Sequence, residues 1–504
     1  MEQPVVLDGA SLTLDEVVAV ARNHVRVAIA PAAAERAGRS RAVIDSALAA
    51  GAAVYGVNTG FGRLQNVRIP SDKLLELQRN LILSHAAGVG DPLPTEIVRA
   101  TMVLRANVLL RETSGVRVVV AERLVALLNE RIHPVVPEQG SVGASGDLAP
   151  LSHIALALLG EGWVESETSG GEARRVRASE ALAAAKIAPL EFQAKEALSF
   201  INGTQVQCAM LGLIIHDARN LWRSAHGAAA MSLEALRGTP EPFDERLHRA
   251  RPHPGQLESA ALMRGLLADS EIRESHRDGD PRVQDAYSLR CTPQVLGAVY
   301  DALEFAARIL DVELNASTDN PLVIDGSLLS GGNFHGQPVA LALDVVAIAL
   351  TTLAGIAERR LERVTNPDLS QGLPAFLTPE AGLQSGFMMV QVTAAALVAE
   401  ARSLCMPASV QSIPTEANQE DFVPMGMAAA YKTRRILANA RRVVAAELLC
   451  AAQGLEYLKP LRPGRGVERV YRRVRDVVAV LTNDRPPADD LEALTTMLTE
   501  ETLL

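Results

Sequence analysis

The sequence is poor in the residues that stabilise small secreted domains and β-sheet cores. Its four cysteines, Cys208, Cys291, Cys405 and Cys450, have no paired spacing, which predicts buried, reduced thiols and argues against a disulfide framework or a zinc site. Aromatic residues make up only 3% of the 504 residues, and the many Ala and Leu residues favour packed helices over sheets. We therefore expect a mainly α protein without a metal centre.

Excess positive charge and membrane-spanning runs are also lacking. The formal net charge is -10, which argues against a nucleic-acid partner because such a protein needs a basic face to displace counterions. The N-terminus carries Glu2 and Asp8 and no apolar segment long enough for a signal peptide, so we expect a cytoplasmic protein. The most apolar run, residues 338–357, contains Asp344 and continues into a charged segment, which predicts a buried helix rather than a membrane span.

One stretch, residues 140–150 (Gly-Ser-Val-Gly-Ala-Ser-Gly-Asp-Leu-Ala-Pro), allows chemistry on the backbone itself. If the fold brings the amide nitrogen of Gly146 to the carbonyl carbon of Ala144, a five-membered ring forms with loss of water. Only glycine has a nitrogen so little hindered and a backbone so free to bend there. Loss of the Ser145 hydroxyl as a second water then leaves an exocyclic methylene on an imidazolone, a strong electrophile that needs no external cofactor.

The same stretch predicts the start of a helix. Asp147 is placed as an N-cap and Pro150 falls in the first turn, so we expect a helix over residues 148–159. The N-terminus of that helix would favour negative charge developing on the ring. The alternative for a Gly/Ser loop of this kind is a helix cap alone, or a nest of backbone N–H groups that binds an anion.

Taken together, these eleven residues resemble the motif of the aromatic amino acid ammonia-lyases, in which Ala-Ser-Gly becomes the 4-methylideneimidazol-5-one (MIO) group. The resemblance extends over nearly the full length of the chain. It implies that Ala144, Ser145 and Gly146 form the MIO electrophile. It also implies the fumarase/aspartase-like helical lyase architecture and a homotetramer whose active sites are shared between subunits.

Two parts of the chain are distinguished by their patterns. We expect a loop-rich N-terminal domain, residues 1–200, that carries the MIO group, and a helical-bundle core with C-terminal helices, residues 201–504. A hairpin predicted at residues 163–176 is the only convincing strand signal. The core helices are apolar around much of their circumference, so we expect a bundle completed by other subunits. Its long helices are predicted at residues 205–236, 292–315, 338–364, 385–404 and 426–455.

Two residues suit the elimination of ammonia from an amino acid. A base must remove the β-proton, and the glycine-rich loop at residues 54–62 presents Tyr55, whose pKa we expect a positive or hydrogen-bonding environment to lower from about 10. The planar fork of Arg290 matches the substrate carboxylate. The alternatives are a packed loop aromatic for Tyr55 and a structural ion pair for Arg290.

The resemblance assigns the same roles to Tyr55 and Arg290 and adds further site residues. It places Asn202, Gln284 and the catalytic Tyr287 around the MIO ring and the substrate, Asn320 near the substrate carboxylate, and Phe334 against the electrophile. These residues lie in polar connectors at helix ends, which one packed bundle could bring to a common pocket.

Two positions bear on the substrate side chain. By resemblance, histidine-acting members of the family carry Ser-His where this chain has Ser84-His85, and an imidazole there could exchange one hydrogen bond with a polar ring. Glu420 stands where enzymes acting on phenylalanine and tyrosine carry Gln, and a carboxylate suits an imidazole but would be desolvated without compensation beside a phenyl ring. Phe422 and Pro424 depart from the histidine-acting pattern and make the pocket wall more apolar.

We weigh Ser84-His85 and Glu420 above these departures. The sequence therefore predicts elimination of ammonia from L-histidine to give trans-urocanate. The alternatives within the same chemistry are a tyrosine or phenylalanine ammonia-lyase and a 2,3-aminomutase, which returns the ammonia to the β-carbon. A different class of protein also remains open, namely a non-catalytic helical assembly protein whose Gly/Ser loop only binds an anion.

Overall fold

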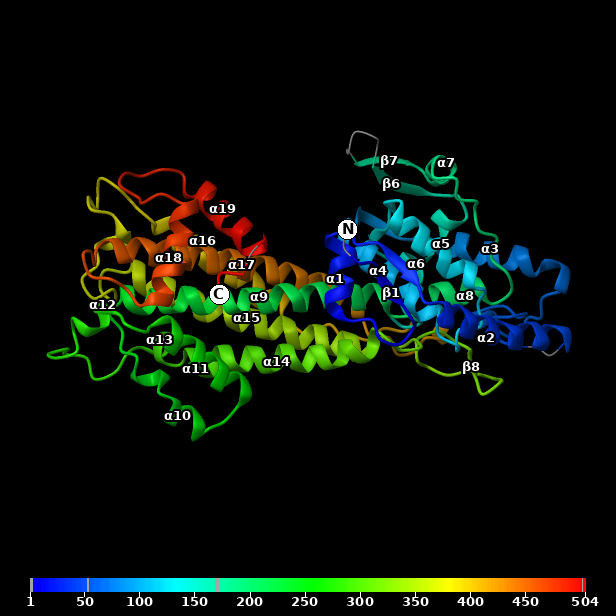
Figure 1. Ribbon diagram of the computed structural model, residues 1–504, viewed down its shortest axis with the longest axis horizontal. Coiled ribbons are helices and arrows are strands. Elements are labelled where there is room, and N and C mark those ends of the chain that lie inside the picture. Colours follow the sequence, from blue (N-terminus) through cyan, green and yellow to red (C-terminus); the bar gives the residue numbers. More distant parts are fainter. Residues whose placement is uncertain (1–2, 52–53, 168–172, 501) are drawn as a thin grey trace. The chain divides into compact units, whose positions relative to one another are not determined.

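The protein is mainly helical, as its composition predicts (Figure 1). The computed structural model describes residues 3–51, 54–167, 173–500 and 502–504. The shorter α-helices of the first two hundred residues are α1 (Leu14–Arg22), α2 (Pro31–Ala49), α3 (Leu74–His85), α4 (Thr95–Leu109), α5 (Val118–Asn129), α6 (Leu148–Leu158), α7 (Ala178–Ala184) and α8 (Glu196–Ile201). The remaining helices are α9 (Gln205–Ala235), α10 (Glu245–Arg249), α11 (Pro254–Leu266), α12 (Glu271–Glu274), α13 (Tyr287–Arg290), α14 (Thr292–Glu313), α15 (Gln337–Thr365), α16 (Met388–Leu404), α17 (Gly426–Glu456), α18 (Arg465–Val477) and α19 (Pro487–Glu500). The five predicted long helices are confirmed as α9 and α14 to α17, close to their predicted bounds.

The strands are short and form four small sheets. They are β1 (Val5–Leu7), β2 (Val27–Ile29), β3 (Val89–Pro92), β4 (Ile132–Pro134), β5 (Pro137–Gln139), β6 (Trp163–Glu167), β7 (Ala173–Arg177), β8 (Leu322–Ile324) and β9 (Ser327–Leu329). β1 pairs with β2 in parallel, β3 pairs with β5, β8 pairs with β9, and β4, β6 and β7 form an antiparallel sheet in that order.

The predicted hairpin is confirmed as β6 and β7, in the register Trp163 to Arg177, while its turn lies outside the described residues. The prediction that this hairpin is the only strand signal is wrong. The other strands have three or four residues, which is too short for a two-residue alternation of polarity to stand out.

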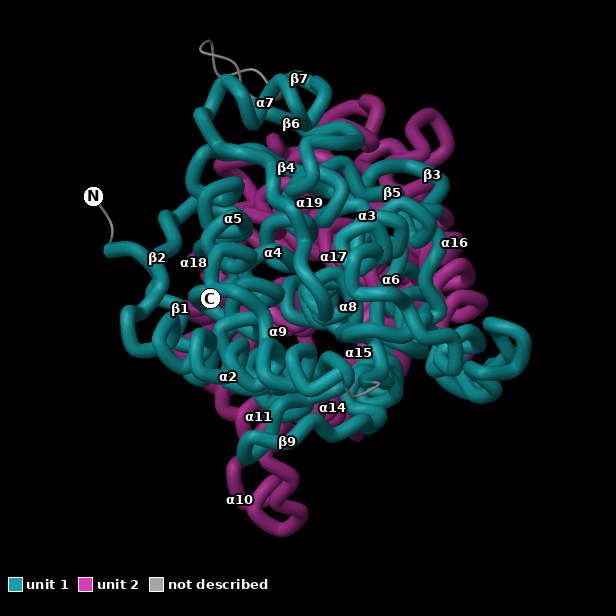
Figure 2. The backbone as a smooth tube through the Cα atoms, turned by 90° about the vertical axis from the view of Figure 1, so that its right-hand side faces the viewer, with its two compact units in different colours: residues 1–213, 307–343, 407–431 teal, residues 214–306, 344–406, 432–504 magenta. Residues whose placement is uncertain are grey.

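The chain folds into two compact units, each built from several separate segments (Figure 2). The first unit comprises residues 1–213, 307–343 and 407–431, and the second comprises residues 214–306, 344–406 and 432–504. Four of the five boundaries between the units fall inside α9, α14, α15 and α17, and the fifth, between residues 406 and 407, follows α16. The predicted division of the chain into domains near residue 200 stays a prediction.

In the first unit, α4 is a central, almost entirely buried helix. Every residue from Ile97 to Leu109 is buried, and α4 packs against α1 and α5 (Figure 1). Two of these buried residues are arginines, Arg99 and Arg105. Charged side chains are rarely buried unless they have partners, so these two mark positions where the core must bind polar groups.

In the second unit, α9, α15 and α17 are joined by a buried ion pair. Arg360 on α15 donates to Glu447 on α17 from Nε (2.5 Å) and Nη2 (2.8 Å), and Ser232 on α9 donates to the same carboxylate at 2.8 Å. All three side chains are buried. Since a buried charge without its partner is strongly destabilising, this arrangement fixes the three helices in one register.

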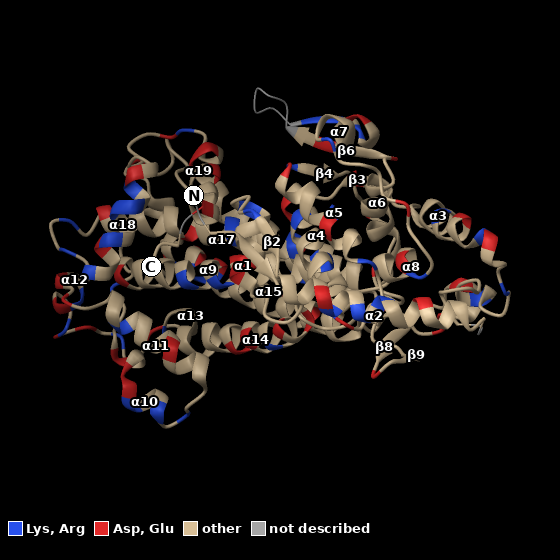
Figure 3. Ribbon diagram, turned by 45° about the vertical axis from the view of Figure 1, so that its right-hand side comes forward, with Lys and Arg blue, Asp and Glu red and all other residues tan. Residues whose placement is uncertain are grey.

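The apolar helix α15 is a core helix, as predicted. Among the described residues it alone is long and apolar enough to cross a membrane, and 61% of its most apolar window is buried inside the protein. Surface charges of both signs are interleaved on helices such as α18 (Figure 3). There Arg472 pairs with Glu468 at 2.7 Å and Arg475 with Glu456 at 3.0 Å, so these arginines form ion pairs rather than a bare basic face.

Candidate active site

The Ala144-Ser145-Gly146 tripeptide lies in the loop between β5 and α6. Two distant segments hold the start of this loop through its backbone. The carbonyl of Gly143 accepts the N–H of Gly336 at 3.1 Å, and the carbonyl of Val142 accepts the N–H of Met425 at 2.9 Å. The loop is therefore fixed by parts of the chain that follow it by hundreds of residues.

A second segment, residues 202–203, lies directly against the tripeptide. The side-chain Nδ2 of Asn202 donates to the carbonyl of Ser145 at 2.6 Å, and the carbonyl of Gly203 accepts the N–H of Asp147 at 2.8 Å. A Cβ atom on Gly146 would overlap the backbone nitrogen and oxygen of Gly203. Gly146 also has φ +78°, a conformation that glycine adopts readily. Both facts require glycine at this position.

Asp147 caps a different helix from the one the sequence predicts. Its side chain makes no capping bond to α6. Instead Oδ2 accepts the N–H groups of Val206 (3.0 Å) and Gln207 (2.9 Å) at the start of α9, and Oδ1 accepts from Ser141 and the Gln207 side chain. The carboxyl is fully buried, and burial raises its pKa to about 7 against these hydrogen bonds. Asp147 thus joins the tripeptide loop to the N-terminus of α9.

The tripeptide opens into a cavity of about 430 Å³ in the first unit. Four of the predicted site residues line it together with Ala144 and Ser145: Tyr55, Asn320, Phe334 and Glu420. The other lining residues are Gly62, Gln65, Ser330, Gly332, His335, Glu416, Gln419, Asp421 and Phe422. The cavity is therefore polar and acidic around the tripeptide, with Phe334 and Phe422 as its aromatic wall.

Glu420 is held between the tripeptide and its own loop. Its Oε1 accepts the Ser145 hydroxyl at 2.5 Å, and its Oε2 accepts the Thr415 hydroxyl at 2.7 Å. The backbone N–H of Thr415 also donates to the carbonyl of Glu420 at 2.8 Å. The carboxylate therefore has one oxygen fixed from behind and the other directed at the Ser145 hydroxyl.

The Tyr55 phenol is near the carboxylates of Glu416 and Glu420. Its hydroxyl oxygen accepts the N–H of Gly62 at 3.3 Å. Burial is the main cause that raises the pKa of Tyr55, the Gly62 N–H opposes it, and the charges of Glu416 and Glu420 raise it further. In the single chain the direction is thus opposite to the predicted one, because no cation among the described residues offsets the two glutamates at the phenol.

His85 ends α3 with its ring in a defined tautomer. Nδ1 lies 2.9 Å from the carbonyl of Leu81 and 3.0 Å from the Ser84 hydroxyl. Since a carbonyl only accepts, Nδ1 carries a proton and Nε2 is the nitrogen left for other partners. Burial lowers the pKa of His85, while the Leu81 carbonyl and the charge of Glu420 raise it. His85 is therefore electrostatically coupled to Glu420, although it is not among the residues that line the cavity.

The remaining predicted residues, Gln284, Tyr287 and Arg290, belong to the second unit. They do not line the cavity of the first. Tyr287 is 71% exposed, and the guanidinium carbon of Arg290 lies 4.7 Å from the centre of its ring. The Nε of Arg290 is buried and has no hydrogen-bond partner in the described part of the chain.

The sequence analysis missed Glu416, Thr415 and His335. Burial and the charge of Glu420 raise the pKa of Glu416, and its carboxylate lies so close to Gly62 that a Cβ there would overlap it. Residues 416–418 all have positive φ angles, and Glu416 at the start of this turn lines the cavity. The spacing of Glu416 and Glu420 was visible in the sequence, but this backbone conformation of residues other than glycine was not.

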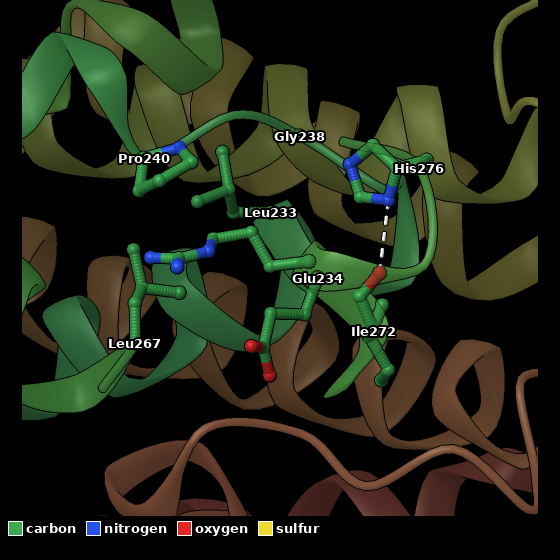
Figure 4. Close-up of a pocket in the computed structure, with 8 residues that line it drawn as sticks. Leu233, Glu234, Gly238, Pro240, Leu267, Ile272 and His276 are labelled. Carbon is green, nitrogen blue, oxygen red and sulfur yellow. Dashed lines mark hydrogen bonds between the residues drawn. The ribbon is translucent and has the colours of Figure 1, made fainter. Parts of the chain in front are cut away.

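A second pocket, in the second unit, surrounds the buried carboxyl of Glu234 (Figure 4). Both carboxylate oxygens accept the N–H of Gly464 at 3.0 Å, and burial raises the pKa of Glu234 to about 7. Nδ1 of His276 lies 2.9 Å from the carbonyl of Ile272. These polar groups bind the protein itself, so the pocket offers little for a ligand.

Comparisons with known proteins point to one family. The profile of the family described as "Aromatic amino acid lyase" matches residues 12–476. The chain is 52% identical over 506 residues to a histidine ammonia-lyase of Anaeromyxobacter dehalogenans, covering 99% of each chain. Its fold matches the crystal structure of a histidine ammonia-lyase from Trypanosoma cruzi (43% identity, TM-score 0.90, 98% of this chain and 93% of that one). It also matches a tyrosine aminomutase from Streptomyces globisporus (40% identity, TM-score 0.93, 99% and 97%).

Replacing Asp147 tests whether its carboxylate stabilises the fold by accepting the N–H groups at the start of α9. In Asp147→Ala the N–H groups of Val206 and Gln207 lose their acceptor, which costs about 1–3 kcal/mol for each buried group left unpaired. We expect a clearly lower thermal unfolding midpoint. Ser141→Ala, which removes one 3.3 Å bond to the same carboxylate and the 3.1 Å bond from the Gly143 N–H but leaves both N–H groups of α9 paired, is the control and should lower the midpoint less. Equal midpoints for the two variants would contradict this role for Asp147.

Proposed function

Because this chain belongs to the aromatic amino acid lyase family, which depends on the MIO electrophile, we propose that it eliminates ammonia from L-histidine to give trans-urocanate and needs no external cofactor. The observation that carries the choice of histidine is the position of Glu420. Its carboxylate lies 2.5 Å from the Ser145 hydroxyl, inside the cavity, and is coupled electrostatically to His85. The same substrate is supported by relatives that are about 50% identical over the full length and are named histidine ammonia-lyase.

The residues present fit the MIO group at positions 144–146. Residue 146 must be glycine because no Cβ would fit there against Gly203, so no side chain hinders its backbone nitrogen, and Asn202 holds the carbonyl of Ser145. The group, formed from Ala144, Ser145 and Gly146 by loss of two waters, supplies an electrophile for the substrate amine.

The chain's own residues then bind the substrate and move its proton. We assign removal of the β-proton to the Tyr55 phenol, which lies in the cavity wall with Ala144 and Ser145. Asn320 and Phe334 line the same cavity, and we assign Asn320 to the substrate carboxylate and Phe334 to the wall against the electrophile. We assign recognition of the imidazole to Glu420, whose carboxylate accepts a charge-assisted hydrogen bond from a ring N–H, and to His85, which lies outside the cavity lining of the single chain and whose Nε2 would accept the second N–H of a protonated imidazole.

The described residues that line the cavity include no lysine or arginine, although the substrate carboxylate requires a cation. We assign that role to Arg290, with Tyr287 and Gln284 beside it, supplied by another subunit of a homotetramer. The exposed Tyr287 ring and the unpartnered Nε of Arg290 support such a contact. A guanidinium near the phenol would lower the pKa of Tyr55, which offsets the rise caused by burial and by the two glutamates. The cytoplasmic location stays a prediction.

A second candidate within the family is a tyrosine or phenylalanine lyase or 2,3-aminomutase. The favouring observation is Phe422, which lines the cavity and stacks on His335 with ring centres 6.2 Å apart. This wall leaves an apolar surface for a phenyl ring. Glu420 opposes that reading, since a carboxylate beside a phenyl ring would be desolvated without a partner.

Two measurements on the purified wild-type protein test the proposal. Incubation with L-histidine, L-tyrosine and L-phenylalanine should give urocanate from histidine, detected by its ultraviolet absorbance. Turnover of tyrosine or phenylalanine with none of histidine would establish the second candidate, and a β-amino acid product would identify a mutase. The intact mass should be two waters below that of the sequence. A full mass without any turnover would instead identify the non-catalytic assembly protein.

Glu420→Gln should shift the preference among substrates. The amide keeps the shape of the side chain but loses the charge that binds the imidazole, so kcat/KM for histidine should fall by about 10²-fold or more. Turnover of phenylalanine, which gains nothing from the charge, should stay equal or rise, and it serves as the control within the same variant. A parallel fall for both substrates would contradict a role for Glu420 in substrate choice.

Glu416→Gln should change the pH dependence. Tyr55 acts as a base only when deprotonated, so kcat/KM rises with pH through its pKa. Because the Glu416 charge raises that pKa, its removal lowers the pKa and should move the rising limb of the pH profile to lower pH. Glu416→Asp keeps the charge and should keep the wild-type limb. A shift of the Glu416→Gln limb to higher pH would show that Glu416 does not act on the base in this way.

A further inference from the structure

Arg105 on α4 hydrogen-bonds residues 199–205, the segment that contacts the tripeptide. Its Nη1 donates to the carbonyl of Asn202 at 3.2 Å and to the Gln205 side chain at 2.5 Å, and its Nη2 donates to the carbonyl of Ser199. The side chain is fully buried. These acceptors belong to the end of α8 and the turn after it, where helical carbonyls lack partners within their own helix.

The held segment contacts the tripeptide on its other face. Asn202 donates to the carbonyl of Ser145, and the carbonyl of Gly203 accepts from Asp147. A Cβ on Gly203 would overlap Nη1 of Arg105. The backbone of residues 202–203 is therefore enclosed between the guanidinium and the tripeptide, with no space for either to shift independently.

Burial of the Arg105 guanidinium at this position costs free energy, because its charge is removed from water. Burial lowers its pKa to about 10, with the charge of Asp319 opposing the change, so it remains a cation. Asp319 in turn accepts from the buried Lys195 at 3.3 Å. The Nε of Arg105 and the Oδ1 of Asp319 are buried without a hydrogen-bond partner in the described part of the chain. A network that is left incomplete in a protein core calls for an explanation beyond stability.

We propose that Arg105 is a positioning residue of the active site. Its planar fork fixes the carbonyls of Ser199 and Asn202 and the amide of Gln205, and so places Asn202 and Gly203 against residues 144–146. This inference rests on the proposed function, since it assigns the fork a role in forming and orienting the MIO group. Lysine carries the same charge but donates from a single point, so the geometry of the fork is separable from its charge.

Arg99 provides a matched control on the same helix. It is also fully buried, and it donates to the backbone carbonyls of Val20 (2.9 Å) and Leu128 (3.1 Å) and to His133 (2.9 Å). None of these partners belongs to residues 199–205 or to the tripeptide. Arg99→Lys therefore measures the loss of stability caused by replacing a buried guanidinium in α4, and it leaves the hydrogen bonds to residues 199–205 unchanged.

The experiment compares Arg105→Lys with Arg99→Lys and the wild type in the full-length protein. Each is measured by thermal unfolding, intact mass, kcat and KM for the substrate that the wild type turns over. We expect both variants to unfold at lower temperature. Only Arg105→Lys should retain a fraction of chains whose mass shows that one or both waters have not been lost. Its kcat should fall by about tenfold or more, while its KM changes by less than about threefold.

Gln205→Leu is the second variant, for the case in which Arg105→Lys does not fold. It removes one acceptor of the fork and should show the same changes in mass and kcat to a smaller extent. The proposal is overturned if the folded Arg105 or Gln205 variant loses both waters completely with kcat within twofold of wild type. It is equally overturned if Arg99→Lys shows the same loss. A wild-type chain of full mass would instead refute the proposed function, which the wild-type arm reports separately.

Discussion

The active site depends on a close contact between two backbone segments of the chain, which meet at residues that have no side chains. Gly146 and Gly203 lie so near each other that a single Cβ would overlap. This closeness requires glycine at residue 146 and puts the Asn202 amide on the Ser145 carbonyl. The contact is held from both sides, by Asp147 bound to the start of α9 and by Arg105 bound to the end of α8. The tripeptide is therefore positioned by the buried end of α8 and the buried start of α9.

Electrostatics complement this geometry. Glu416 and Glu420 converge on the cavity that also holds the Tyr55 phenol, so one chain by itself presents a negative site to a substrate that carries a carboxylate. Such a site is unsuitable for catalysis until positive charge arrives. The only predicted cation, Arg290, belongs to the second unit, beside an exposed tyrosine. Charge balance thus gives a physical reason for the proposed homotetramer, which the apolar helices alone would not specify.

Much of the fold follows from local sequence signals, whereas the fine structure of the site does not. The capping box at Thr13 and the long apolar helices were predictable because their signals are contained within a few turns. The three-residue strands were not, because their pairing comes from tertiary contacts. Asp147 has the right residue type and position to cap α6, yet its carboxylate turns to α9, which only the packing of two helices decides. The pKa of Tyr55 likewise depends on Glu416 and Glu420, which lie more than three hundred residues later.

The hydrogen bonds from Gly336 and Met425 to the loop before the tripeptide also bear on how the protein matures. A nascent chain still emerging from the ribosome has synthesised the Ala-Ser-Gly sequence long before either donor exists. The loop therefore acquires its constrained shape only after translation has passed residue 425 and the distant segments have docked. Under the proposed function, the reactive group forms only once these segments have docked, which ties formation of the electrophile to synthesis of the chain as far as residue 425.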